Sequence, residues 1–206
     1  MVDRLASQDS VIYRCFMAEN LPRPLWDFVV QVYALDGVKE ACLALQERRD
    51  VDVSLLLFSV WAGKIGHGVF STNILKSVLK ISDEWQTSVI KPLRKVRNFL
   101  KNRATEGTKI QVLRISILEN ELSAERQELT ALGDLFSGDP NVQQSENSQI
   151  DHALRNTLDV LKSSKVGLTE EDLRDIKIIC AAVFSEESKF PNWLDNVNAV
   201  TAPNLD

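Results

Sequence analysis

Residues 21–63 read LPRPLWDFVVQVYALDGVKEACLALQERRDVDVSLLLFSVWAG, and this stretch decides the fold. Behind Pro24, which the first turn of a helix tolerates, apolar residues recur at the i, i+3, i+4 and i+7 spacing of one helix face. They are Leu25, Phe28, Val29 and Val32. Asp36 and Gly37 break this pattern, and residues 38–49 begin a new one. The stretch therefore predicts two consecutive amphipathic helices.

Residues 53–64 form an almost wholly apolar segment directly after these two helices. Because such a helix has scarcely any polar face, we expect it to be central and enclosed by the others. Asp50 and Asp52 precede it and are candidate N-caps. Paired carboxylates can also serve acid–base chemistry or hold a metal, but their position directly before a helix favours capping. The glycine-rich stretch 63–68 is expected to end the helix.

Helical patterns also dominate the rest of the chain, at residues 71–80, 83–102, 108–136 and 150–163 and after Thr169. Ser82 is expected to cap the helix at 83–102. Pro92 is expected to kink it, because proline removes a backbone hydrogen bond. No alternating pattern of convincing length predicts a strand. We therefore expect an all-α protein, a compact multi-helix bundle with a C-terminal helical hairpin.

Changes in composition divide the chain into five parts. They are an N-terminal extension (1–20), a main helical bundle (21–136), a linker (137–147), a helical hairpin (148–184) and a polar tail (185–206). The linker begins with Ser-Gly-Asp-Pro and continues with polar residues, which is typical of a connection between helices.

The composition favours a cytoplasmic protein. The longest apolar run is far shorter than the roughly 20 residues that a membrane span requires, and the N-terminus lacks the features of a secretory signal. The three cysteines, Cys15, Cys42 and Cys180, are odd in number and far apart. We expect them to be reduced, packed thiols, as is usual in the cytosol.

Motifs for catalysis or metal binding are missing from the sequence. His67 and His152 are far apart, and neither has a partner at the spacing of a helical metal site. Serine-nucleophile, HExxH and CxxC motifs are absent. Residues 63–68 resemble a phosphate loop, but they follow a helix and lack the GK[ST] ending, so a helix C-cap explains them. We expect no cofactor, no metal and no catalytic residue, and we favour a protein that is not an enzyme.

Charge is unevenly distributed along the chain, although the net charge of −5 argues against general affinity for nucleic acid. Residues 86–114 carry 8 basic side chains and one acidic side chain, Glu106, whereas residues 115–206 carry 7 basic and 17 acidic ones. On a regular helix, one face of this basic segment would be apolar and buried, formed by Val89, Leu93, Val96 and Leu100. The opposite face would be a cationic stripe of Lys91, Arg94, Arg97 and Lys101.

Such a stripe of one sign is mildly unfavourable by itself, because like charges at i, i+4 repel. It can stay solvated or pair with acids of the same chain, of which Glu119, Glu121, Glu125 and Glu128 are candidates. It can also meet an acidic protein or a small anionic ligand. Nucleic acid is the third interpretation.

A resemblance to a known family rests on four motifs in order: LPRPLWDF (21–28), VYALDGVKEACLALQE (32–47), DVDVSLLLFSVWAG (50–63) and, after Trp85, VIKPLRKVRNFLK (89–101). The chain resembles a bacterial, typically proteobacterial, helical protein family of unknown function over about residues 21–133. This resemblance implies a small cytosolic helical protein. It implies no particular activity, cofactor or site residue.

Most residues of these motifs have a packing or capping explanation, and Gln46, Arg94 and Arg97 have the weakest one. We therefore expect the binding site to include them, with Lys91, Lys101 and Trp85. Our hypothesis is a non-enzymatic adaptor or regulator that binds an acidic protein partner, or a second copy of itself, through its basic helix face. A pocket protein or enzyme that acts on an anionic small molecule is the alternative.

Overall fold

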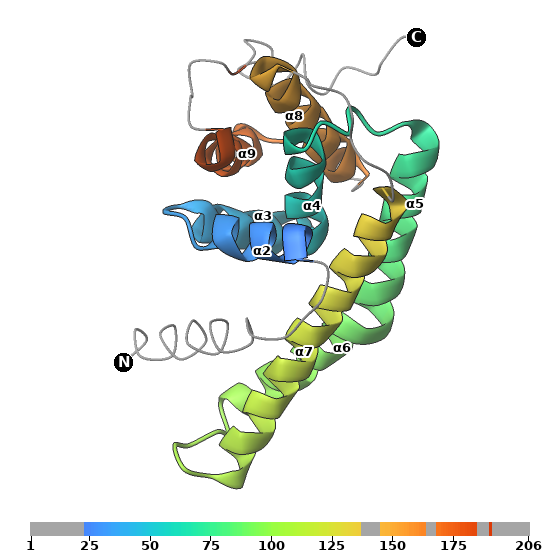
Figure 1. Ribbon diagram of the computed structural model, residues 1–206. Helices are drawn as coiled ribbons and strands as arrows, with labels where there is room; N and C mark the ends of the chain where they lie inside the picture. The colour runs from blue at the N-terminus through green and yellow to red at the C-terminus, as the bar shows by residue number, and fades with distance from the viewer. Residues whose placement is uncertain (1–22, 137–144, 164–167, 185–189, 191–206) are drawn as a thin grey trace.

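The computed structural model describes residues 23–136, 145–163, 168–184 and 190. The predicted N-terminal extension, Cys15 and nearly all of the linker and tail lie outside these residues. Regular secondary structure within them is entirely helical, and the helices pack together, which confirms the predicted all-α bundle (Figure 1). The helices are α2 (Arg23–Tyr33), α3 (Val38–Arg49), α4 (Val53–Lys64), α5 (Thr72–Trp85), α6 (Lys91–Lys101), α7 (Lys109–Gly133), α8 (Glu146–Lys162) and α9 (Glu170–Phe184), with a π-helical segment η2 (Gln86–Ile90) and a 3-10 turn η3 (Asp134–Phe136).

Helix α4 is the centre of the bundle. Its Leu56, Leu57 and Phe58 side chains are fully buried, and α2, α7 and α8 all pack against it. This confirms the prediction of a central, enclosed helix. Asp52 caps its N-terminus as expected, because its carboxylate accepts a hydrogen bond from the Ser54 amide at 2.9 Å. Asp50 instead ends α3, with a positive φ of 52°.

Gly63 lies inside α4 and does not end it, contrary to the expectation. Helix α8 crosses α4 at this point so closely that a Cβ on Gly63 would lie 2.3 Å from the backbone nitrogen of Ala153. Glycine usually destabilises a helix interior. At this position the missing side chain allows the backbones of α4 and α8 to approach closely. The helix ends after Lys64, and Gly66 follows with a positive φ of 84°.

The two C-terminal helices share the core of the main bundle. Helix α8 packs along α4, and α9 packs against α3. Their buried side chains, among them Leu154 and Phe184, belong to the same apolar cluster as Leu45 and Leu57. Helix α8 begins a turn earlier than expected, with Ser145 as its N-cap. The α9 N-terminus follows the prediction, because the Thr169 hydroxyl accepts a hydrogen bond from the Asp172 amide.

Helices α5 and α6, joined by η2, form one continuous rod, and α7 runs antiparallel beside it; the α6–α7 end of this hairpin extends away from the bundle (Figure 1). Ser82 is therefore buried in the last turn of α5, inside this rod, and the expectation that it caps a helix is wrong. Ser71 caps the rod instead. Pro92 lies in the first turn of α6, and the π-helical segment Gln86–Ile90 ends two residues before it. The wider spacing of a π-helix loosens the bonding pattern that proline would disrupt.

Candidate functional site

Two arginines of α6 point toward α7 and are held there by its glutamates. Arg94 donates through Nε to Glu121 Oε1 at 2.8 Å and through Nη2 to Glu125 Oε1 at 2.9 Å. Arg97 donates through Nε to Glu121 Oε2 at 2.6 Å, so Glu121 binds both arginines. The Glu121 side chain is only 3% exposed. These four residues form a largely buried ion-pair network.

A second set of polar side chains continues this network toward the centre of the bundle. The buried Gln86 of η2 donates through Nε2 to Glu128 Oε2 at 3.3 Å. Ser82 donates its hydroxyl hydrogen to Asp52 Oδ2 at 2.7 Å. We call Asp52, Ser82, Gln86, Arg94, Arg97, Glu121, Glu125 and Glu128 the hairpin cluster. Its four carboxyl groups outnumber its two arginines, so its charges do not balance.

Burial, together with this surplus of carboxyl groups, raises the pKa values of two glutamates. Burial, with the nearby charges of Glu121 and Asp52, raises the pKa of Glu125 to about 7, although Arg94 opposes the shift. Burial also raises the pKa of Glu128 far above its usual range, and the Asp52 carboxylate raises it further. Glu128 is therefore a neutral carboxylic acid at pH 7, as expected for a buried carboxyl group beside an anion.

An open hollow lies between the end of α3 and the side of α6. Its volume is about 390 Å³. The side chains that line it are polar or charged: Gln46, Asp50, Lys91, Arg94, Lys95 and Asn98. Lys91 Nζ pairs with Asp50 Oδ2 at 2.6 Å. The hollow and the hairpin cluster meet at Arg94, which belongs to both.

The expected division of α6 into a buried apolar face and an exposed cationic stripe holds only in part, because Leu100 is buried and Lys101 is exposed but other residues depart from it. Val96 is 45% exposed, whereas the Arg97 side chain is 19% exposed. The arginines turn toward α7 because its glutamates satisfy their charge. Apolar side chains are left on the outside of the hairpin instead, and Phe99, at 59% exposed, is the largest of them.

These exposed apolar side chains gather in the outer part of the hairpin. Val96 and Phe99 are three residues apart on α6, as Ile110 and Leu113 are on α7. Helix geometry places Phe99 about 200° around α6 from Arg97, so it points away from α7, and it places Leu113 about 80° around α7 from Glu121, beside the contact between the two helices. The guanidinium carbon Cζ of Arg103 lies 3.9 Å from the centre of the Phe99 ring. We call Val96, Phe99, Ile110, Leu113 and Arg103 the hairpin face.

The structure brings together four of the six residues singled out in the sequence. Gln46, Lys91 and Arg94 line the hollow, and Arg97 lies in the adjacent cluster. Lys101 is exposed in the last turn of α6, and the half-buried Trp85 ends α5. Sequence reasoning missed Lys95, Asn98 and Phe99, because the orientation of α6 depends on its contacts with α7 and not on its own periodicity.

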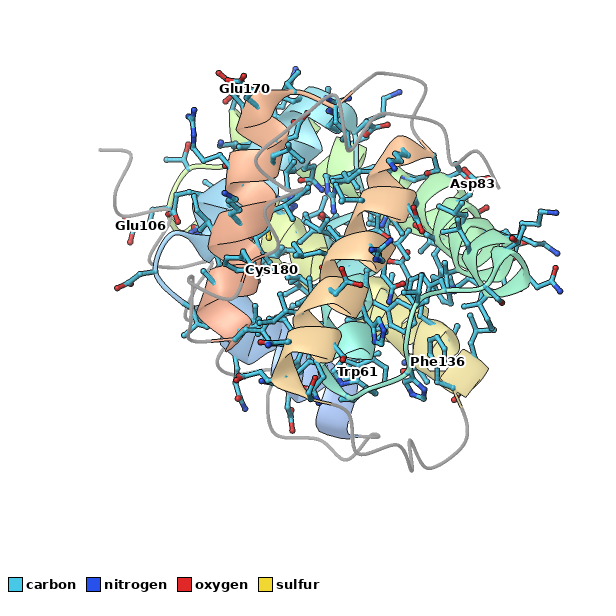
Figure 2. All side chains as sticks on the ribbon, turned by 90° about the horizontal axis from the view of Figure 1, so that it is seen from above. Trp61, Asp83, Glu106, Phe136, Glu170 and Cys180 are labelled. Carbon is cyan, nitrogen blue, oxygen red and sulfur yellow. The ribbon has the colours of Figure 1, made fainter. Side chains whose placement is uncertain are left out.

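Side chains of the glycine-rich stretch 63–68 make packing contacts with aromatic residues. The His67 ring stacks on Phe136 with 4.2 Å between ring centres, and Lys64 Nζ lies 4.7 Å from the Phe184 ring centre. Figure 2 shows the labelled Trp61 and Phe136 at the same edge of the molecule. Burial lowers the pKa of His67. The structure supports the interpretation of this stretch as a helix end and turn.

Two of the cysteines lie within the described residues, and both are free and buried. Burial raises the pKa values of Cys42 and Cys180 to about 12, so neither is a reactive thiolate at neutral pH. Across the described part of the chain, no group of three or more His, Cys, Asp or Glu side chains is arranged to hold a metal ion. In the same residues, no helix is both long and apolar enough to cross a membrane.

The fold and the site together define an all-α protein with a charged hairpin and a polar hollow at its base. Comparison with protein families matches residues 24–132 to the family described as protein of unknown function (DUF2390), and the chain belongs to this family. The match includes the hairpin cluster, the hollow and the hairpin face, whereas α8 and α9 lie beyond it. Neither curated proteins nor solved structures gave a match.

Proposed function

We propose that this protein is a non-enzymatic binding module whose α6–α7 hairpin holds an acidic protein partner. The observation that carries this proposal is the hairpin face, where Phe99 and Leu113 are half or more exposed on a segment rich in cations. Residues 86–114 carry 8 basic side chains and a single acidic one. Apolar anchors surrounded by charges of one sign are typical of a surface that binds a partner of the opposite sign.

The arginines that the sequence suggested for this role are engaged elsewhere. Arg94 and Arg97 bind Glu121 and Glu125 within the chain. Exposed Lys101 and the Arg103 guanidinium over Phe99 remain to meet acidic side chains of the partner. Exposed ion pairs contribute only about 0–1 kcal/mol each. The affinity therefore has to come mainly from the apolar anchors, with the cations selecting an acidic partner.

The test is affinity purification from native lysate, with nuclease, comparing wild type with the Phe99→Ala, Leu113→Ala double variant. We expect a stoichiometric acidic partner in the wild-type sample, and a loss of affinity of about tenfold or more in the double variant with an unchanged melting temperature. Leu35→Ala, Leu43→Ala is the matched control, because both leucines are similarly exposed but lie outside the hairpin. Equal capture by all three proteins, or a partner released by nuclease, would contradict the proposal.

A further inference from the structure

We infer that the hollow between α3 and α6 binds a phosphate group. The lining supplies three cationic side chains from α6, Lys91, Arg94 and Lys95. It also supplies the side-chain amides of Gln46 and Asn98. This site goes beyond partner binding by the hairpin face, with which it shares no residue.

The cations of the hollow are not all neutralised within the chain. Lys91 pairs with Asp50, and this carboxylate is the single acid in the lining. Lys95 is exposed, and within the described residues it has no ion pair. Arg94 pairs with Glu121 and Glu125 behind the lining, so Lys95 is the cation of the hollow that no described acid neutralises, and its charge draws an anion toward the surface.

Arg94 is already oriented for such a ligand. Its Nε and Nη2 atoms are bound by Glu121 and Glu125, which fixes the plane of the guanidinium. No described residue accepts a hydrogen bond from its Nη1 atom, which leaves that end of the group for a ligand in the hollow. A guanidinium held in place loses little conformational freedom when it binds an oxyanion.

The polarity of the lining selects the class of ligand. Apolar small molecules bind in pockets lined mostly by hydrophobic side chains, and the lining of this hollow has none. A phosphate group offers several acceptor oxygens and up to two negative charges. It can therefore use ammonium, guanidinium and amide donors that approach from both helices at once.

The experiment is a titration of the full chain with inorganic phosphate and, separately, with phosphoserine, followed by NMR of the side-chain amides and by calorimetry. We expect saturable shifts of the Gln46 and Asn98 amide signals. Lys95→Glu should weaken binding by about tenfold or more, because it replaces a free cation with an anion. Lys101→Glu, the same change on the same helix but outside the hollow, should weaken it less than about twofold.

The outcomes separate this site from the hairpin face. Tighter binding of phosphoserine than of inorganic phosphate would assign the site to a phosphate ester, and equal affinities would assign it to the free anion. Absence of saturable shifts in the wild-type protein, or equal weakening by Lys95→Glu and Lys101→Glu, would overturn the inference. Phe99→Ala is expected to leave phosphate binding intact, so failure of the partner proposal would not remove this result.

Discussion

Two sets of ion pairs join different helices of this molecule, and they are built differently. One is the hairpin cluster between α6 and α7. The other, which we call the α3–α9 clamp, joins Arg48 and Arg49 to Asp172 and Asp175. In the clamp, two arginines meet two aspartates, so the charges balance. In the hairpin cluster, four carboxyl groups share two arginines.

The pKa values of the carboxyl groups in the two sets shift in opposite directions. Burial alone would raise the pKa of Asp172, but hydrogen bonds from Arg49, Thr169 and Arg48 outweigh it and lower the pKa to about 2. The pKa of Glu125 in the hairpin cluster is instead raised to about 7. A balanced pair stabilises the folded state, whereas surplus buried carboxyl groups are tolerated only by holding protons. The clamp is therefore held by balanced charges, whereas the cluster depends on protonation of its carboxyl groups.

Breaking the clamp should destabilise the folded protein more than breaking the hairpin cluster. Asp172→Asn removes the charge that compensates Arg49, whose side chain is only 3% exposed. Removing one partner of a buried ion pair costs about 3–5 kcal/mol. We expect a loss of that size in the free energy of unfolding, measured by urea denaturation followed by circular dichroism.

Asp175→Asn is the matched control for this change. Asp175 pairs with Arg48, whose side chain is 31% exposed, at the edge of the same clamp. Pairs near the surface contribute about 0–1 kcal/mol. Similar losses from the two substitutions would show that burial of Arg49 is not what makes the clamp strong.

The raised pKa of Glu125 in the hairpin cluster should make the free energy of unfolding depend on pH. Glu125 has an ordinary pKa of 4.5 and a folded-state pKa of about 7. Between these values the folded state keeps a proton that the unfolded state has lost, so the free energy of unfolding falls as pH rises. The slope approaches about 1.4 kcal/mol per pH unit for one such group.

Urea denaturation at several pH values between 4.5 and 8 measures this slope. In Glu125→Gln the contribution of this residue should disappear, so that the variant loses less stability than wild type as pH rises. Glu106→Gln, in the exposed turn at the end of the hairpin, should retain the wild-type slope. The clamp does not interfere, because stability from Asp172 is lost only as pH falls from 3.8 toward 2.

The sequence predicted the helices much better than it predicted the hairpin cluster. Periodicity and caps located α3, α4 and α7 within a few residues, because these signals are local. The charge asymmetry correctly drew attention to Arg94 and Arg97. The direction in which these arginines point depends on Glu121, 24 or more residues away on another helix. No pattern within α6 contains that information.

Only some of the residues that line the hollow could be predicted from the sequence. Gln46 and Arg94 were singled out because packing did not explain them, and they line the same hollow. Lys95 was not among the residues assigned to the cationic stripe. Helix α3 approaches that side of α6, as the Lys91–Asp50 pair shows, and this tertiary contact gives Lys95 its place in the lining.

Glu128→Gln should have the smallest effect on stability, although it replaces a carboxyl group by an amide just as Asp172→Asn does. Glu128→Gln replaces a buried carboxyl group by an amide, but here the carboxyl group is already neutral at pH 7. The oxygen of the new amide can accept the hydrogen bond that Gln86 donates to the carboxyl group, so this contact is retained. We expect a change in the free energy of unfolding of about 0–1 kcal/mol at pH 7. A loss as large as that of Asp172→Asn would mean that Glu128 is ionised and that the hairpin cluster depends on its charge, as the clamp depends on the charge of Asp172.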